Sequence, residues 1–384
     1  MPARKLYYED CHLRQFTATV TGCVQTAKGY EVTLSATAFY PEGGGQACDL
    51  GVLGGVRVLD VRERDEDVIH LCDGPLAEGT EVEGTINWDR RFDLMQQHTG
   101  EHILSGLIHE KYGYHNVGFH VGKQAMEIDF DGPIPVEELM ELEAKANAAI
   151  WQDLQIKCWY PSREKLPNVT YRSKRELPWP VRIVQVPGFD SCACCGVHTA
   201  RTGEVGIIKI LGAMKFHEGI RIEMLCGRRA YEFLGQVYDQ NRLVSQAFSA
   251  KILQTGEAAR RMNEQLNQEK LRAALLEKRV FAFLAGSYEK AGDVVHFEDG
   301  LSSVGVRELA DAIAERCGGI AAVFSGSDEA GYSMCLIGKG LDVKPLGTEL
   351  TRALNGRGGG KPGSFQGSLK TTRQEIEGFF RSRG

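Results

Sequence analysis

Two short motifs, more than ninety residues apart, constrain the fold of this 384-residue chain most strongly. The first is HTGEH, in which His98 and His102 are four residues apart, and the second is CACCGVH, in which Cys194 and His198 form a C-x-x-x-H pair. On a helix, the first spacing puts both imidazoles on one face. Two nitrogens from a helix, with one thiolate and one nitrogen from a loop, complete a tetrahedral zinc set. The sequence therefore predicts that the two motifs meet around Zn²⁺.

Each motif also has a competing interpretation. Two surface histidines often fall four residues apart by chance, and cysteines are often buried as small hydrophobic residues. The motif HTGEH also matches H-x-x-E-H, the signature of inverted zinc proteases, in which Glu101 would be the general base. Three cysteines in four residues beside a histidine favour a metal site, and the protease leaves that cluster unexplained. Spacing alone leaves Cys195 open as the thiolate ligand, because it forms C-x-x-H.

The composition of the chain indicates its cellular compartment and restricts the kind of partner that it can bind. The chain has eleven cysteines, an odd number, which argues against a disulfide framework and favours a reducing cytoplasm. The sequence contains no stretch of about 18 apolar residues, so we expect no membrane span. Its first residues lack the apolar core of a secretory signal. The formal net charge is −6, so a polyanionic partner must meet local basic patches.

Hydrophobic patterning predicts an α+β protein of four domains. Residues 1–88 alternate like the strands of a small β-barrel, and residues 89–228 read as an α+β zinc-binding domain. In that second domain we expect a helix that is capped by Asp89 and ends near Gly113, and a second helix from about Val136.

The remaining two domains have different compositions. Residues 229–287 are charge-rich and almost free of glycine and proline, which predicts either a helical hairpin or a coiled-coil spacer that dimerises. Residues 288–384 alternate strand and helix as a small α/β domain. This domain contains NGRGGGKPGSFQG, predicted as a glycine-rich loop that lacks P-loop spacing. A homodimer would form through the spacer or this last domain.

Taken together, HTGEH, CCGVH and the upstream FYPEGGGQACDLG resemble the editing domain of alanyl-tRNA synthetase. They resemble its free-standing relatives, the AlaX alanyl-tRNA editing proteins, even more closely. The family pattern H-x-x-x-H followed by C-x-x-x-H falls on His98, His102, Cys194 and His198, which favours Cys194 over its neighbours. The spacer and the last domain are similar to those of the synthetase and of long AlaX proteins, and the last module also occurs in DHH-type phosphoesterases.

The resemblance implies zinc-dependent hydrolysis of the ester that links serine, or as a second candidate glycine, to the 3′ end of tRNA(Ala). It implies catalytic roles for His98, His102 and Gln46. Because the predicted barrel begins at about residue 5, no adenylation domain fits before it, and a free-standing editor is expected. Val197 stands where the family usually has threonine, so the substrate preference stays open. The alternative is a zinc-stabilised tRNA-binding protein without catalysis.

Two further segments are candidate substrate contacts. Gly43, Gly44 and Gly45 allow close backbone approach, and Gln46 can both donate and accept, so GGGQ is predicted to line the pocket, with Asp49 capping its turn. The simpler interpretation is a β-turn with an exposed glutamine. The segment 163–182 interleaves basic and aromatic residues, which suits phosphate contact and base stacking. We expect tRNA contacts from Arg172, Lys174 and Arg175 there.

Overall fold

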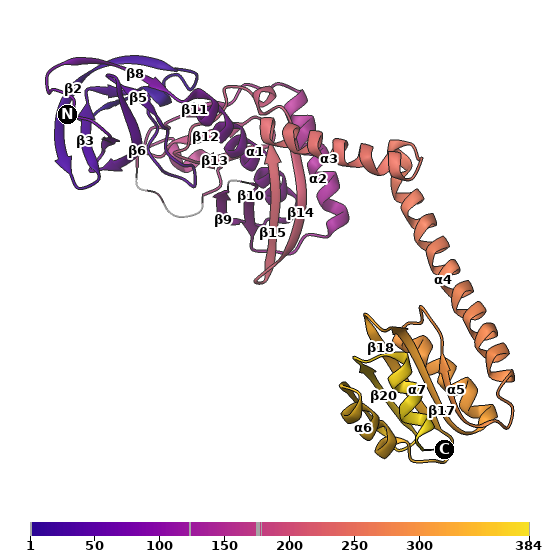
Figure 1. Cartoon of the computed structure of the whole chain (residues 1–384). Coiled ribbons are helices and arrows are strands. Elements are labelled where there is room, and N and C mark those ends of the chain that lie inside the picture. Colours follow the sequence, from indigo (N-terminus) through magenta and orange to yellow (C-terminus); the bar gives the residue numbers. More distant parts are fainter. Residues whose placement is uncertain (1, 123, 174–176, 178, 384) are drawn as a thin grey trace. The chain divides into compact units, whose positions relative to one another are not determined.

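The computed structural model describes residues 2–122, 124–173, 177 and 179–383, and the chain divides into two compact units, 1–242 and 243–384. The predicted mixed α+β class is confirmed. Figure 1 shows strands and helices in both units. None of the described helices has the length and apolar character that crossing a membrane requires.

The first unit begins with strands that close on themselves. Hydrogen bonds join six strands in the closed order β2 (Gln15–Thr26), β3 (Gly29–Leu34), β7 (Asp67–Cys72), β6 (Val56–Arg64), β5 (Gly51–Leu53) and β8 (Glu81–Ile86). Buried and exposed residues alternate at the start of β2, so that Phe16, Ala18 and Val20 point into the barrel. Two short segments, β1 (Arg4–Lys5) and β4 (Ala36–Thr37), pair in parallel beside it, with the turn η1 (Leu6–Tyr8) following β1.

The long helix α1 (Trp88–Tyr112) follows the barrel and carries the HTGEH motif. Its predicted end is confirmed, because Gly113 adopts a left-handed φ of 73° that glycine accepts without strain. The predicted cap was wrong. Asn87 caps the helix by accepting a hydrogen bond from Arg90 N, and Asp89 lies inside the first turn. Both residue types suit a cap, and the helix simply begins earlier than its apolar periodicity indicated.

Two sheets and one helix surround α1. The larger sheet has the order β14 (Ile208–Phe216), β15 (Gly219–Cys226), β10 (Met126–Phe130) and β9 (Asn116–Val121). The smaller has the order β11 (Lys157–Trp159), β12 (Ile183–Val186) and β13 (Asp190–Ala193), and the second helix is α2 (Val136–Trp151). Short 3-10 turns are η2 (Leu166–Asn168) and η3 (Thr202–Val205). Ile103, Leu142 and Ile222 join α1, α2 and the larger sheet in one core.

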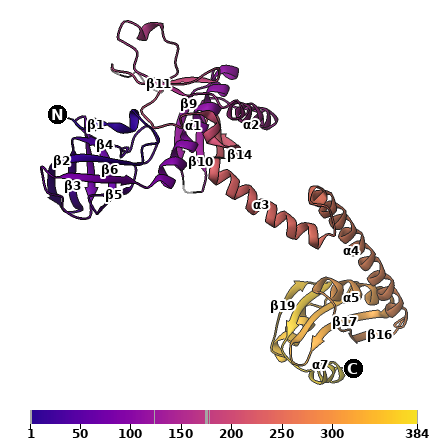
Figure 2. The same ribbon diagram turned by 90° about the horizontal axis from the view of Figure 1, so that it is seen from above.

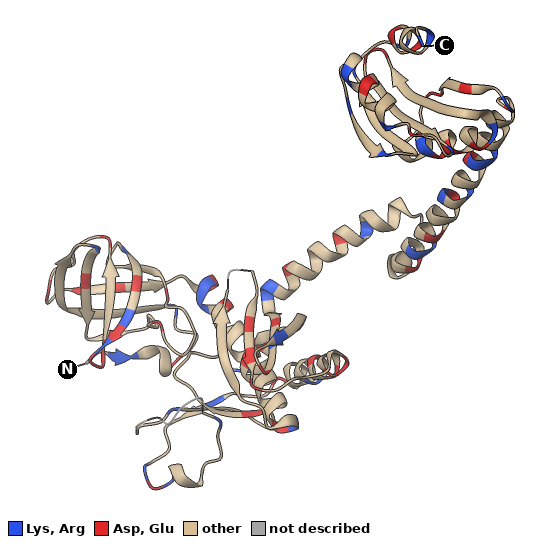
Figure 3. Ribbon diagram, turned by 90° about the horizontal axis from the view of Figure 1, so that it is seen from below, with Lys and Arg blue, Asp and Glu red and all other residues tan. Residues whose placement is uncertain are grey.

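The predicted helical spacer consists of two helices with a break between them. Helix α3 (Gly227–Ala247) crosses the boundary between the units, and η4 (Ile252–Gln254) precedes α4 (Thr255–Gly286). Basic and acidic residues are interspersed along α4 (Figure 3), in agreement with the charge-rich composition of this segment. Dimerisation through this segment stays a prediction.

The second unit contains a five-stranded sheet in the order β16 (Gly292–Phe297), β17 (Gly318–Ser327), β18 (Gly331–Gly338), β20 (Ser364–Leu369) and β19 (Gly356–Lys361). Its helices are α5 (Ser303–Cys317), α6 (Lys344–Ala353) and α7 (Arg373–Arg381). The predicted glycine-rich loop was wrong, because its residues form the β19–β20 hairpin. Only glycine fits there: a Cβ on Gly358 would lie 2.6 Å from the Phe365 ring, and one on Gly360 would lie 2.0 Å from Ser364 O.

Candidate metal centre

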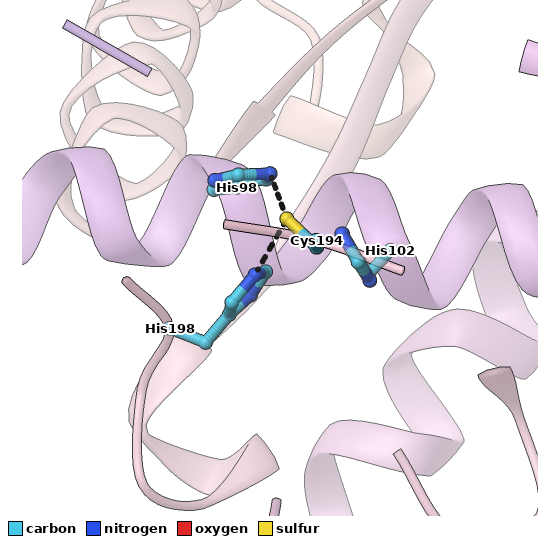
Figure 4. A group of neighbouring side chains, drawn as sticks. All are labelled: His98, His102, Cys194 and His198. Carbon is cyan, nitrogen blue, oxygen red and sulfur yellow. Dashed lines mark hydrogen bonds between the residues drawn. The ribbon is translucent and has the colours of Figure 1, made fainter. Parts of the chain in front are cut away.

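The two motifs meet in the first unit, as the sequence predicted. His98 and His102 project from the same face of α1, and Cys194 and His198 lie on the loop that follows β13 (Figure 4). One ligand atom from each of the four residues lies within 4.8 Å of all the others. The three imidazoles are almost completely buried, while Cys194 keeps partial exposure.

The spacing of these atoms fits a shared tetrahedral ion. Cys194 Sγ lies 3.5 Å from both His98 Nε2 and His198 Nε2. A nitrogen about 2.1 Å and a sulfur about 2.3 Å from one tetrahedral zinc lie about 3.6 Å apart. The donor set of three imidazoles and one thiol therefore matches zinc in both chemistry and dimensions.

Neighbouring charges favour the thiolate form of Cys194, which is the form that binds a metal. Burial alone would raise the pKa of the Cys194 thiol, but His98 and His102 outweigh burial and hold the pKa well below its ordinary value. Burial and the same two imidazoles lower the pKa of His198. A thiolate and a neutral imidazole are the forms that bind a metal.

Each histidine has a polar side chain close to its second ring nitrogen. Gln46 Oε1 lies 2.9 Å from His98 Nδ1, and Thr99 Oγ1 lies 3.3 Å from His198 Nδ1. Asp190 Oδ2 lies 2.9 Å from His102 Nδ1. In metal sites, side chains at this position orient the imidazole toward the ion. Thr99 and Asp190 were missed by sequence reasoning, although both lie within or beside the two motifs.

The loop between the ligand candidates Cys194 and His198 is held by hydrogen bonds to its carbonyl groups. Arg182 Nη1 donates to Cys194 O at 2.9 Å and to Gly196 O at 2.8 Å, and Tyr8 OH donates to Cys195 O at 2.6 Å. The Arg182 guanidinium also lies 4.5 Å from the centre of the Tyr8 ring. Three consecutive carbonyls are thus fixed by side chains from two separate segments, which sequence spacing could not reveal.

The glycine turn predicted to line the pocket lies against this loop. Gly43 and Gln46 exchange two backbone hydrogen bonds, of 2.9 and 3.1 Å, which close a tight turn. Gly44 and Gly45 adopt left-handed φ values of 59° and 81°, which favour glycine. Gln46 is buried rather than exposed, and its oxygen also accepts from Val197 N at 3.1 Å. The structure thus joins the turn to the HTGEH helix and to the loop.

Among the remaining predicted residues, Glu101 lies next to a ligand candidate, since its Oε2 is 3.8 Å from His102 Nε2. Glu101 is buried and accepts hydrogen bonds from Ser105 and Asn116, which ties α1 to β9. Arg172 forms an ion pair with Asp190. It belongs to a long loop around η2 that Figure 2 shows beside β11. Lys174 and Arg175 lie outside the described residues.

The alternative cysteine ligand, Cys195, is not part of the four-residue group. Cys195 is exposed as a residue, and its thiol lies beside the glycine turn, where a Cβ on Gly44 would be 3.1 Å from its Sγ. The geometry therefore favours Cys194, as the family pattern does.

Replacing Gly196 with alanine is expected to weaken zinc binding by about tenfold or more, because a metal ligand would lose its orientation. The added Cβ would lie 2.2 Å from His98 Cε1 and 2.4 Å from His98 Nδ1, so the ring or the loop must move. Competition with a coloured zinc chelator measures the change. Gly212→Ala is the matched control, since its Cβ meets nothing within 4 Å. Equal zinc affinity in the two variants would contradict the observed packing.

Sequence comparison places this site among known proteins. Residues 181–223, which include Cys194 and His198, match the family described as "Threonyl and Alanyl tRNA synthetase second additional domain". The chain is 27% identical to the alanyl-tRNA editing protein Aarsd1 of Danio rerio, over 97% of this chain and 96% of that protein. The mouse Aarsd1 is 28% identical, over 97% of this chain and 95% of that protein.

The similarity extends to much longer proteins. The alanine–tRNA ligase of Thermofilum pendens is 32% identical over 97% of this chain, which spans only 43% of the ligase. The family resemblance drawn from the motifs is thereby confirmed: over nearly its whole length, the chain is a homologue of the alanyl-tRNA editing proteins and of the matching region of alanine–tRNA ligases.

Proposed function

We propose that this protein is an aminoacyl-tRNA deacylase that acts in trans on mischarged tRNA(Ala). Its substrate would be Ser-tRNA(Ala), with Gly-tRNA(Ala) as a second candidate, and the reaction would depend on zinc. Hydrolysis adds water across the ester, so a free amino acid leaves and the tRNA regains its 3′-terminal hydroxyl. Homology to alanyl-tRNA editing proteins over nearly the full length supports the enzyme class.

The observation that carries the proposal is the buried group of His98, His102, Cys194 and His198, with its tetrahedral spacing, in a homologue of editing proteins. Zinc bound there would polarise a carbonyl or a water molecule, or hold the amino group of the substrate. Four protein ligands leave little room for an attacking water, so positioning the substrate is as consistent with the donor set as activating water.

The side chains around the group would bind and orient the ester. Gln46 Nε2 is buried and makes no hydrogen bond within the described part of the chain, so it can donate to a serine hydroxyl or an ester carbonyl. Gly44 and Gly45 are exposed beside it, which leaves the backbone open to the 3′ end of the tRNA. Cys194 is the partly exposed member of the group.

A deacylation assay with Ser-, Gly- and Ala-tRNA(Ala) tests this function. We expect release of serine that a chelator stops and added zinc restores, with Ala-tRNA(Ala) spared. Binding of tRNA without turnover, together with unfolding on zinc removal, would instead indicate a structural zinc in an RNA-binding protein. Peptide cleavage that depends on Glu101 would indicate an inverted zinc protease, although that function leaves Cys194 and His198 without a role.

Two substitutions of Gln46 separate its two roles. Gln46→Glu keeps an oxygen for His98 Nδ1 and Val197 N but removes the amide donor, so zinc binding should persist while kcat falls about 100-fold, as for loss of one transition-state donor. Gln46→Leu removes the acceptor as well and should also weaken zinc binding about tenfold. Zinc competition and single-turnover deacylation measure the two effects. Full activity of Gln46→Glu would exclude substrate contact by the amide.

Other parts of the proposal rest on the sequence. We propose the domain bounds 1–88, 89–228, 229–287 and 288–384, tRNA contacts from Arg172, Lys174 and Arg175, and a homodimer through the spacer or the last domain. All eleven cysteines are free thiols, which supports a cytoplasmic location. Size-exclusion chromatography with light scattering tests the dimer, and tRNA binding by charge-reversal variants tests the contacts.

A further inference from the structure

A buried ion pair lies behind His102, on the side away from Cys194. Asp190 is the first residue of β13, and its side chain is 1% exposed. Its Oδ1 accepts from Arg172 Nε at 2.7 Å, and its Oδ2 accepts from Arg172 Nη2 at 3.0 Å. The same Oδ2 lies 2.9 Å from His102 Nδ1 as an ion-pair contact, and that nitrogen makes no hydrogen bond within the described part of the chain. A guanidinium, a carboxylate and an imidazole therefore form one chain of contacts that ends at the candidate metal centre.

The backbone holds both members of the pair in place. Arg172 N donates to Ser191 O at 2.7 Å, and Arg172 O accepts from Ala193 N at 2.9 Å, so Arg172 is bound alongside β13. Gly106 lies one helical turn after His102 on α1. A Cβ there would lie 2.2 Å from Phe189 O and 2.7 Å from Asp190 Cβ. The absence of a side chain at Gly106 is what lets the start of β13 come so close to α1.

Charge explains why the arginine is present. A buried carboxylate without a partner is strongly destabilising, whereas a two-point arginine pair compensates much of that cost. The side chain of Arg172 is 10% exposed, so most of it is buried with this pair.

We propose that Asp190, held by Arg172, is the positioning residue that orients His102 as a metal ligand. The carboxylate favours the ring with its proton on Nδ1, which leaves the lone pair of Nε2 facing Cys194. The other two histidines have neutral partners, Gln46 and Thr99, so His102 alone receives an anionic one. This inference rests on the proposed zinc site and adds a role for Arg172 that is independent of tRNA.

The test compares zinc affinity in four full-length variants by chelator competition. Asp190→Asn should weaken zinc binding about 10- to 100-fold, the usual effect of losing such a partner. Arg172→Gln and Gly106→Ala should each weaken it by less, because the carboxylate remains. Asp129→Asn is the matched control. Asp129 forms an equivalent two-point pair with Arg221 in the larger sheet, so this variant loses a similar ion pair without touching a ligand.

A cobalt(II)-loaded sample gives a readout that a purely structural role would not change. The visible absorption bands report ligand geometry, and we expect them to shift in Asp190→Asn and to stay as in the wild type in Asp129→Asn. Melting curves of the metal-free proteins show whether each variant is folded; if Asp190→Asn is not, Arg172→Gln carries the test. Unchanged affinity and spectra in the folded variants overturn the role of Asp190. A wild-type protein that binds no zinc overturns the zinc site itself.

Discussion

Replacing Cys194 with alanine is expected to reduce zinc affinity and the rate of Ser-tRNA(Ala) deacylation by at least about 100-fold each. Loss of a partner in the outer shell costs about 10- to 100-fold in metal affinity, so loss of a ligand itself must cost more. Cys194 is also the one thiolate of the group, and its Sγ lies 3.5 Å from two ligand nitrogens. A metal centre commonly lowers a hydrolytic barrier by several kcal/mol. Since about 1.4 kcal/mol corresponds to a tenfold change in rate, loss of the metal is expected to slow deacylation at least about 100-fold.

The matched control is Cys195→Ala, one residue along the same loop. Cys195 is an exposed residue outside the group, so zinc affinity should stay within about twofold of the wild type. The reverse result, in which Cys195→Ala loses zinc and Cys194→Ala keeps it, would make Cys195 the ligand. If Cys194→Ala loses zinc but deacylates at the full rate, the metal is structural. Circular dichroism of both variants shows that the loss is not unfolding.

The candidate centre could be predicted from the sequence because its ligands follow local rules. The spacing of His98 and His102 has meaning only on a helix, and the apolar periodicity around them predicted that helix. The distant C-x-x-x-H pair supplied the two further ligands that a tetrahedral zinc site needs, so the two segments were expected to meet. The α+β class followed in the same way, from alternation in some segments and helical periodicity in others.

The residues that support the centre could not be predicted, because their roles depend on contacts between distant segments. Arg172 looks like a phosphate contact in a basic stretch, and only the fold shows its pair with Asp190. Tyr8 lies 187 residues from the carbonyl that it holds. The glycine-rich segment of the last domain reads as a loop, yet the Phe365 ring and the close approach of β19 and β20 require glycine in a hairpin.

Replacing Asp49 with alanine is expected to lower the free energy of unfolding of the first unit by about 3–5 kcal/mol, the cost of leaving one buried charge without its partner. Asp49 and Arg91 are both fully buried. The carboxylate accepts from Arg91 Nε at 2.9 Å and from Tyr40 N at 2.6 Å. It therefore joins the first turns of α1 to the segment that leads into the glycine turn. All four tryptophans lie in residues 1–242, so their fluorescence during urea denaturation of the whole chain reports this unit.

Asp73→Ala is the matched control, because Asp73 also accepts from a backbone N–H and from an arginine, both of Arg57, but at the surface. Exposed pairs contribute about 0–1 kcal/mol, so this variant should change stability little. The double variant Asp49→Ala, Arg91→Met should recover part of the loss, since an apolar replacement leaves no unpaired charge. Equal effects of Asp49→Ala and Asp73→Ala would contradict the burial of the pair. Because Arg91 lies about two helical turns before His98 and Asp49 three residues after Gln46, Asp49→Ala should also weaken zinc binding.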